Sequence, residues 1–315
     1  MVEPAAGAPT VSRPASSSQP PAASPRRRDL GAWPVRVAWL LLPLVAGPAI
    51  GDLLDGRSRP VGWVAGGLAA LGWAGGLVAT LVPHPLGLTA LRVLGPTALV
   101  LAAWATLSGD ATVGAVVAAV AATIVACLTI ASGTTIDAFV DGASYGAERR
   151  FGLRVPASLL FGPLPLTWVV VVGGTAAGPL LVAAGAPVVG VALVVVGWPL
   201  AVGGLRALHG LAVRCVVFVP NGLVVADRTV LTQPVFFPRP AIAGLGAAEA
   251  GTDATDLTAG ALRLVVEVRL ADPVAATRRR GRRGSEEVVL HAFLMSPVRP
   301  GALIDAAREH RLPVA

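Results

Sequence analysis

The sequence predicts a membrane protein of about six transmembrane helices (membrane all-α), followed by a small C-terminal antiparallel β module closed by one helix. The 315-residue chain is 54% hydrophobic and only 14% charged, whereas soluble domains carry about 25% charged residues. The apolar residues gather in one region, and an alternating, strand-like pattern begins only after residue 210. A charge deficit this large and this concentrated is typical of a chain that crosses the membrane several times.

The N-terminal residues 1–32 predict a disordered cytoplasmic tail. They are rich in Pro, Ala and Ser and lack the apolar periodicity that a packed element needs. The basic group Arg26, Arg27 and Arg28 precedes the first apolar stretch, and positive charge at that place favours the cytoplasmic side.

Six apolar stretches follow, each long enough to cross about 30 Å of hydrocarbon at about 1.5 Å per residue. We expect the spans at residues 34–54, 61–82, 87–107, 111–132, 157–184 and 187–206. Together they define a transmembrane domain over residues 33–208, with a polar cytoplasmic loop at 133–155. Glycine and proline interrupt several spans, and glycines four residues apart in the second favour close helix packing.

Arginine predicts the orientation, because the cytoplasmic flanks of membrane helices are enriched in positive charge. None of the basic residues is lysine, and the net charge is +7. With the N-terminus inside, the inner flanks hold Arg26, Arg27, Arg28, Arg36, Arg92, Arg149, Arg150, Arg154, Arg206 and Arg214. The outer links hold Arg57 and Arg59. We therefore expect a multi-pass protein of the plasma membrane with both termini in the cytoplasm.

Residues 209–315 predict the β module. Short β-branched runs, the hairpin signal Asn221-Gly222 and the alternation over residues 262–270 predict strands. Pro297-Val-Arg-Pro-Gly opens a terminal helix at about residues 300–311. Short antiparallel strands closed by one helix form an α+β or barrel-like module.

Three segments of this module resemble a bacterial PH-like domain found on the cytoplasmic side of membrane proteins. They are Phe218-Val-Pro-Asn-Gly-Leu-Val-Val, Phe237-Pro-Arg-Pro-Ala-Ile-Ala-Gly-Leu and Ser296-Pro-Val-Arg-Pro-Gly-Ala-Leu-Ile. The polar stretch Phe139-Val-Asp-Gly-Ala-Ser-Tyr-Gly-Ala-Glu-Arg-Arg, with this tail, resembles a family of actinobacterial multi-spanning membrane proteins of unassigned function. The resemblance implies an architecture and supplies no activity.

The polar segment 133–155 is the best candidate for a site, because it is a long polar interruption with apolar stretches on both sides. Its candidate binding residues are Asp137, Asp141, Tyr145, Glu148, Arg149, Arg150 and Arg154. Asp137 and Asp141 are four residues apart and share a face of a helix. With Glu148 they form a candidate set of oxygen ligands for a divalent cation, against the simpler interpretation of turns and solvated charge. The arginines are either cytoplasmic anchors or ligands of a lipid phosphate.

A second basic segment lies in the β module and contains Arg278, Arg279, Arg280, Arg282 and Arg283. It is either a solvated loop or an electrostatic attachment to anionic lipid, which contributes about 1 kcal/mol per arginine near the surface. We expect it to face the acidic residues of segment 133–155. A nucleic-acid partner is not expected, because no aromatic residues are interleaved for base stacking.

Catalytic, metal and cofactor motifs do not stand out. No P-loop, His-Glu-x-x-His or Gly-x-Ser-x-Gly pattern occurs, and neither Cys127 nor Cys215 lies in a Cys-x-x-Cys pair. The four histidines are scattered at His84, His209, His291 and His310. We therefore expect no catalytic residues, no metal and no cofactor.

Three functions are open. The first is a non-enzymatic scaffold or regulator whose PH-like module binds a protein partner, a second copy of the chain or lipid headgroups. The second is a transporter or channel for a small neutral or apolar solute, favoured by the Gly/Pro-interrupted spans but not by their lack of mid-membrane ionisable groups. The third is a lipid-acting membrane enzyme that uses Asp137, Asp141 and Glu148.

Overall fold

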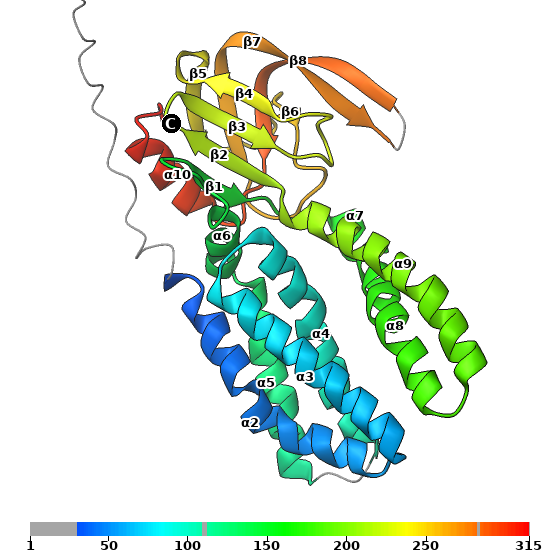
Figure 1. Cartoon of the computed structure of the whole chain (residues 1–315). Coiled ribbons are helices and arrows are strands. Elements are labelled where there is room, and N and C mark those ends of the chain that lie inside the picture. The colour runs from blue at the N-terminus through cyan, green and yellow to red at the C-terminus, as the bar shows by residue number, and fades with distance from the viewer. Residues whose placement is uncertain (1–29, 109–111, 282–283, 315) are drawn as a thin grey trace, which may run out of the picture.

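Six long apolar helices are followed by a β-sheet region and a final helix, as predicted (Figure 1). The computed structural model describes residues 30–108, 112–281 and 284–314. Most of the predicted tail, the link at 109–111, and Arg282 and Arg283 lie outside the described residues. Within the described ranges, six helices are long and apolar enough to cross a membrane, which indicates a multi-pass membrane protein.

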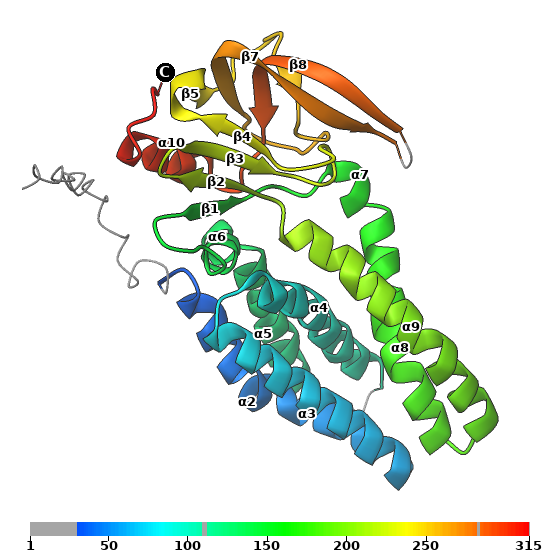
Figure 2. The same cartoon turned by 45° about the horizontal axis from the view of Figure 1, so that its top comes forward.

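The first four long helices form one bundle (Figures 1 and 2). They are α2 (Trp33–Asp55), α3 (Arg59–Leu81), α4 (Pro85–Ser108) and α5 (Val113–Ala131). The indole N–H of Trp39 in α2 donates to the carbonyl oxygen of Trp73 in α3 at 2.9 Å, and the indole of Trp73 donates to the carbonyl of Trp39 at 3.1 Å. In an apolar environment without water, such reciprocal bonds satisfy donors that would otherwise be costly to bury.

The last two long helices form a hairpin that diverges from the bundle (Figures 1 and 2). The helices concerned are α8 (Pro163–Ala183) and α9 (Pro187–Ala212), preceded by the short α7 (Ala157–Leu160). A Cβ atom added to Gly174 would lie 2.6 Å from the carbonyl oxygen of Gly197, and one added to Gly197 would lie 2.8 Å from that of Gly174. Only glycine permits this close approach. Helix α9 continues past the predicted end at residue 206 and leads almost directly into the β region.

The β domain, residues 149–152 and 215–314, contains two four-stranded sheets. The first has the order β1-β2-β3-β4 and the second β5-β7-β8-β6. The strands are β1 (Arg149–Gly152), β2 (Cys215–Val219), β3 (Gly222–Ala226), β4 (Val235–Pro238), β5 (Ile242–Ala247), β6 (Thr255–Asp256), β7 (Val266–Arg280) and β8 (Gly284–Met295). All pairs are antiparallel except β6 with β8. Helix α10 (Pro300–Glu309) closes the domain.

One apolar core joins both sheets to α10. Phe237 of the first sheet stacks on Phe293 of the second, with ring centroids 4.7 Å apart. Phe218 packs edge-on against Phe151 at 5.7 Å and stacks on His310, which follows α10, at 5.2 Å. Burying each phenylalanine contributes about 1.5–3 kcal/mol. Because Phe151 is buried in this cluster, strand β1 belongs to the core of the β domain.

Strand β1 comes from segment 133–155, which the sequence assigns to a loop of the transmembrane domain. It pairs with β2 from Arg149 opposite Phe218 to Gly152 opposite Cys215. The β domain thus takes its first strand from the chain before the α8–α9 hairpin, and that hairpin is inserted between two neighbouring strands. The sequence does not predict this strand, because Arg-Arg-Phe-Gly shows neither an apolar run nor a clear alternation.

Candidate functional site

The polar segment 133–155 begins with a helix, α6 (Gly133–Asp141). Ser132 separates it from α5: the residue has an extended backbone, and its hydroxyl accepts a hydrogen bond from the N–H of Thr135 at 3.3 Å. This is a helix N-cap. As predicted, Asp137 and Asp141 lie one turn apart on the same helix, and both are buried.

The two aspartates hold the free edge of β1. The Oδ1 atom of Asp137 accepts the N–H of Gly152 at 3.1 Å, and the Oδ1 atom of Asp141 accepts the N–H of Arg150 at 2.8 Å. Residues four apart on a helix are separated by about 6 Å along its axis. Residues two apart on a strand are separated by about 6.6 Å. The spacings match, so two carboxylates cover the N–H groups that an edge strand leaves unpaired.

The second carboxylate oxygen of Asp137 has no direct hydrogen bond. Its Oδ2 atom is buried without a hydrogen-bond partner among the described residues, and the nearest cation, Arg299, places Nη1 3.9 Å away. Burial raises the pKa of the Asp137 carboxyl to about 7, against the opposing effects of the Gly152 N–H and of Arg299. Asp137 therefore changes its charge near neutral pH.

The arginines of the segment attach β1 to the C-terminal part of the β domain. Arg149 forms an ion pair of 3.1 Å with Glu309 of α10. Arg154 donates from Nη2 to the carbonyl oxygen of Val298 at 2.7 Å. The predicted contact between segment 133–155 and the C-terminal part of the β domain therefore exists. Its partners in that part are Arg299, Glu309 and the carbonyl of Val298, and not the predicted arginines 278–280.

Glu148 and Tyr145 lie in the turn before β1. Glu148 forms an ion pair with Arg150, with Oε2 3.0 Å from Nη2, while Tyr145 is 86% exposed. Across the described ranges, no three His, Cys, Asp or Glu side chains gather as a metal-ligand set. Asp137, Asp141 and Glu148 therefore do not converge on one cation here, and the first two are engaged by the backbone of β1.

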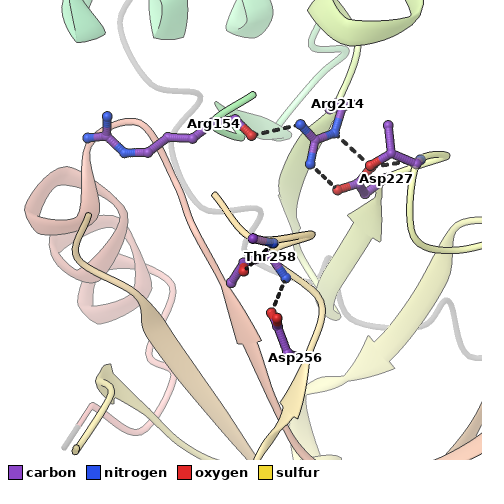
Figure 3. Close-up of polar contacts among 7 residues, drawn as sticks. Arg154, Arg214, Asp227, Asp256 and Thr258 are labelled. Carbon is purple, nitrogen blue, oxygen red and sulfur yellow. Dashed lines mark hydrogen bonds and ion pairs between the residues drawn. The ribbon is translucent and has the colours of Figure 1, made fainter. Parts of the chain in front are cut away.

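A buried ion pair that the sequence reasoning missed fixes the other end of the inserted hairpin (Figure 3). Arg214, between α9 and β2, donates from Nε and Nη2 to the two oxygens of Asp227 at 2.8 and 2.6 Å. Its Nη1 donates to the carbonyl oxygen of Arg154 at 2.7 Å. The side chains are 2% and 1% exposed. A signal was present: an arginine directly before the apolar run of β2 needs a buried partner.

The second basic segment is mostly a β-hairpin. Strand β7 continues to Arg280, and Arg278 lies opposite Glu286 of β8, where opposite charges stabilise a cross-strand pair. Arg280 is 3.8 Å from Glu286, and its side chain is 82% exposed. In both views the hairpin projects beyond the sheet on the side where α7 lies (Figures 1 and 2). The predicted lipid-contact residues Arg278, Arg279 and Arg280 therefore lie near a projecting tip.

No family model, no curated protein and no solved structure matches this chain. The PH-like and actinobacterial resemblances therefore stay predictions.

Proposed function

We propose that this protein is a non-enzymatic membrane scaffold or regulator whose β domain binds anionic lipid headgroups through the β7–β8 hairpin. Both termini and the β domain lie in the cytoplasm in this proposal. The observation that carries it is the pairing of Gly152 with Cys215, which brings the two ends of the α8–α9 hairpin together at the base of the β domain. A domain attached at two adjacent strands keeps a defined height and orientation above the membrane.

The projecting arginines supply the contact with lipid. Arg279 and Arg280 are exposed, and each arginine near an anionic surface contributes about 1 kcal/mol. The bond from the N–H of Arg279 to the carbonyl oxygen of Val230 at 2.6 Å holds this part of β7 against the body of the domain. The arginines are thus presented on an ordered strand.

Exposed apolar side chains next to α7 lie on the side toward which the hairpin projects. Phe161 is 80% exposed and Leu160 44% exposed, and both directly precede the membrane helix α8. Exposed phenylalanine and leucine side chains at the end of a membrane helix favour the boundary between headgroups and acyl chains. The hairpin tip therefore projects toward the side on which this proposal places the lipid headgroups.

The test uses the full-length protein in nanodiscs with a fluorescent probe on Ser285→Cys, opposite Arg279. We expect quenching by nitroxide-labelled lipids in bilayers that contain phosphatidylglycerol and little quenching in phosphatidylcholine alone. The double variant Arg278→Gln/Arg280→Gln should lose the quenching. Arg308→Gln/Arg311→Gln, with the same charge change at exposed residues elsewhere on the domain, should keep it.

Equal quenching in neutral and anionic bilayers would show that the hairpin does not bind headgroups. A protein partner is then the interpretation to test, by crosslinking from residue 285.

A second candidate function is transport of a small apolar solute, favoured by a crevice of about 440 Å³ between α2, α3, α4 and α8. Its volume lies within the range of about 300–1,000 Å³ of ligand pockets. Its polar groups are internally satisfied: Trp39 and Trp73 bond to each other, and the Thr97 hydroxyl donates to the carbonyl of Val93 at 2.7 Å. Ala98→Phe, which fills the crevice, should then lower flux into proteoliposomes, whereas Val189→Phe on an exposed face should not.

A further inference from the structure

A second, smaller cavity of about 180 Å³ lies where α4, α6, α9 and β2 meet. These elements meet at the end of the long helices that carries the β domain (Figure 1). Four chemically active side chains line it: His84 before α4, Arg150 of β1, His209 near the end of α9 and Cys215 of β2. These four residues come from three distant parts of the chain, near residues 84, 150 and 209–215, so only folding brings their side chains together.

Hydrogen bonding fixes where the two imidazoles carry their protons. The Nδ1 atom of His84 accepts the N–H of Leu86 at 3.3 Å, so the neutral ring carries its proton on Nε2 and is a donor there. The Thr89 hydroxyl donates its single hydrogen to the carbonyl of Pro85 at 3.0 Å. It therefore accepts from Nδ1 of His209 across their 3.0 Å contact.

Arg150 supplies the positive charge of the cavity wall. Its backbone N–H is held by Asp141, and its Nη2 is paired with Glu148 at 3.0 Å. Its Nε atom is buried and has no hydrogen-bond partner among the described residues. Because the Glu148 and Arg150 side chains are each about 30% exposed, their ion pair contributes little and another anion can compete for the guanidinium.

The remaining wall adds no negative charge. Burial raises the pKa of the Cys215 thiol to about 11, so the thiol stays neutral and is a poor metal ligand. Helix α4 begins beside the cavity at Pro85, and the N-terminus of a helix favours anions. The lining therefore combines one guanidinium, an imidazole N–H donor, a second imidazole and a helix start, with Glu148 as the competing carboxylate.

We propose that this cavity binds the phosphate group of an anionic phospholipid, with Arg150 and His84 as donors and His209 beside them. Its volume is below the roughly 300 Å³ at which drug-sized pockets begin, so it accepts a headgroup fragment and not a whole lipid. The proposal rests on the proposed function, because it adds a defined headgroup site at the junction between the long helices and the same β domain. It uses residues separate from the β7–β8 hairpin.

The experiment titrates the full-length protein in neutral detergent and counts bound ligand by native mass spectrometry. The probes are dioctanoyl phosphatidylglycerol, dioctanoylglycerol with the same chains but no phosphate, and inorganic phosphate. We expect one phosphatidylglycerol to bind tightly and dioctanoylglycerol not to compete. If inorganic phosphate binds as tightly as the phosphatidylglycerol, the cavity is still a phosphate site, but its ligand is the free ion and not a lipid.

Two variants with opposite expected effects on lipid binding test whether Arg150 holds the phosphate. Arg150→Gln keeps the backbone bond to Asp141 and should weaken binding about tenfold or more, as expected for loss of a charged hydrogen-bond partner. Glu148→Gln removes the competing carboxylate and should strengthen binding. Arg149→Gln, with the same charge change at the neighbouring residue that pairs with Glu309, should leave binding unchanged.

Equal binding of phosphatidylglycerol and dioctanoylglycerol, or no response to both Arg150→Gln and Glu148→Gln, would overturn the proposal. The hairpin variant Arg278→Gln/Arg280→Gln should bind the short-chain lipid normally. Loss of quenching at residue 285 and loss of lipid binding in the cavity are therefore separate results, and either proposal can fail alone.

Discussion

The Asp137 carboxylate on α6 accepts a hydrogen bond of 3.1 Å from the backbone N–H of Gly152 on β1, and its other oxygen is buried without such a bond among the described residues. Burial raises its pKa from 3.8 to about 7. Between these two values the folded protein keeps a proton that the unfolded chain releases. The free energy of unfolding therefore falls as the pH rises through this interval, by at most about 1.4 kcal/mol per pH unit.

Asp137→Asn should remove this part of the pH dependence, because the amide keeps an acceptor for Gly152 and carries no charge. We expect the variant to be more stable than the native protein at about pH 8 and to differ little at about pH 4. Thermal unfolding in detergent across this range measures it. Asp305→Asn, at an exposed residue of α10, is the control, and an unchanged pH slope in Asp137→Asn would contradict the assignment.

Asp141→Ala should loosen β1 without unfolding the β domain. The carboxylate accepts the backbone N–H of Arg150 and the Ser144 hydroxyl, both at 2.8 Å, and leaving such a buried donor unpaired costs about 1–3 kcal/mol. Hydrogen exchange of the Arg150 amide should accelerate, while exchange in β3 stays slow. Asp141→Asn keeps an acceptor and should show a smaller effect; equal exchange in all three proteins would refute the role.

Replacing one member of the Arg214–Asp227 pair should be strongly destabilising. Asp227→Ala leaves a guanidinium buried at 2% exposure without its counter-ion, and breaking such a pair costs about 3–5 kcal/mol. The double variant Arg214→Met/Asp227→Leu should recover much of the loss, because it buries no charge. The midpoint of thermal unfolding measures both, and a double variant as unstable as Asp227→Ala would show that the pair has no net electrostatic role.

Gly174→Ala should separate α8 from α9. The new Cβ would lie 2.6 Å from the carbonyl oxygen of Gly197, and such overpacking costs about 1–3 kcal/mol. Gly173→Ala is the matched control, since a Cβ there meets nothing within 4 Å. Disulfide crosslinking between cysteines placed across the two helices should become slower in Gly174→Ala only.

The sequence predicted the elements whose signals are local. Twenty-residue apolar runs identify membrane helices, and Asn221-Gly222 identifies the β2–β3 turn, because both patterns act within one element. The sequence did not predict β1, because its partner strand β2 lies more than 60 residues further along the chain. The four residues of β1 also carry no strand pattern of their own.

The candidate site was predicted as a set of residues but not as an arrangement. Segment 133–155 was recognised from its charge, and the shared helix face of Asp137 and Asp141 followed from their spacing. Their partners are backbone N–H groups of β1, which have no sequence signature. The projecting hairpin was predicted as a loop because arginine-rich segments are usually solvated, whereas here cross-strand partners such as Glu286 keep it extended.

The position of the α8–α9 hairpin between β1 and β2 also sets an order of assembly. Strand β1 is synthesised before α8 and α9 and β2 after them, so the first sheet can close only after both helices have been synthesised. A hairpin that crossed the membrane only once would leave β1 and β2 on opposite sides. Completion of the first sheet therefore requires β1 and β2 to lie on the same side of the membrane, and until then Phe151 and Phe218 lack the edge-on contact that they make in the folded domain.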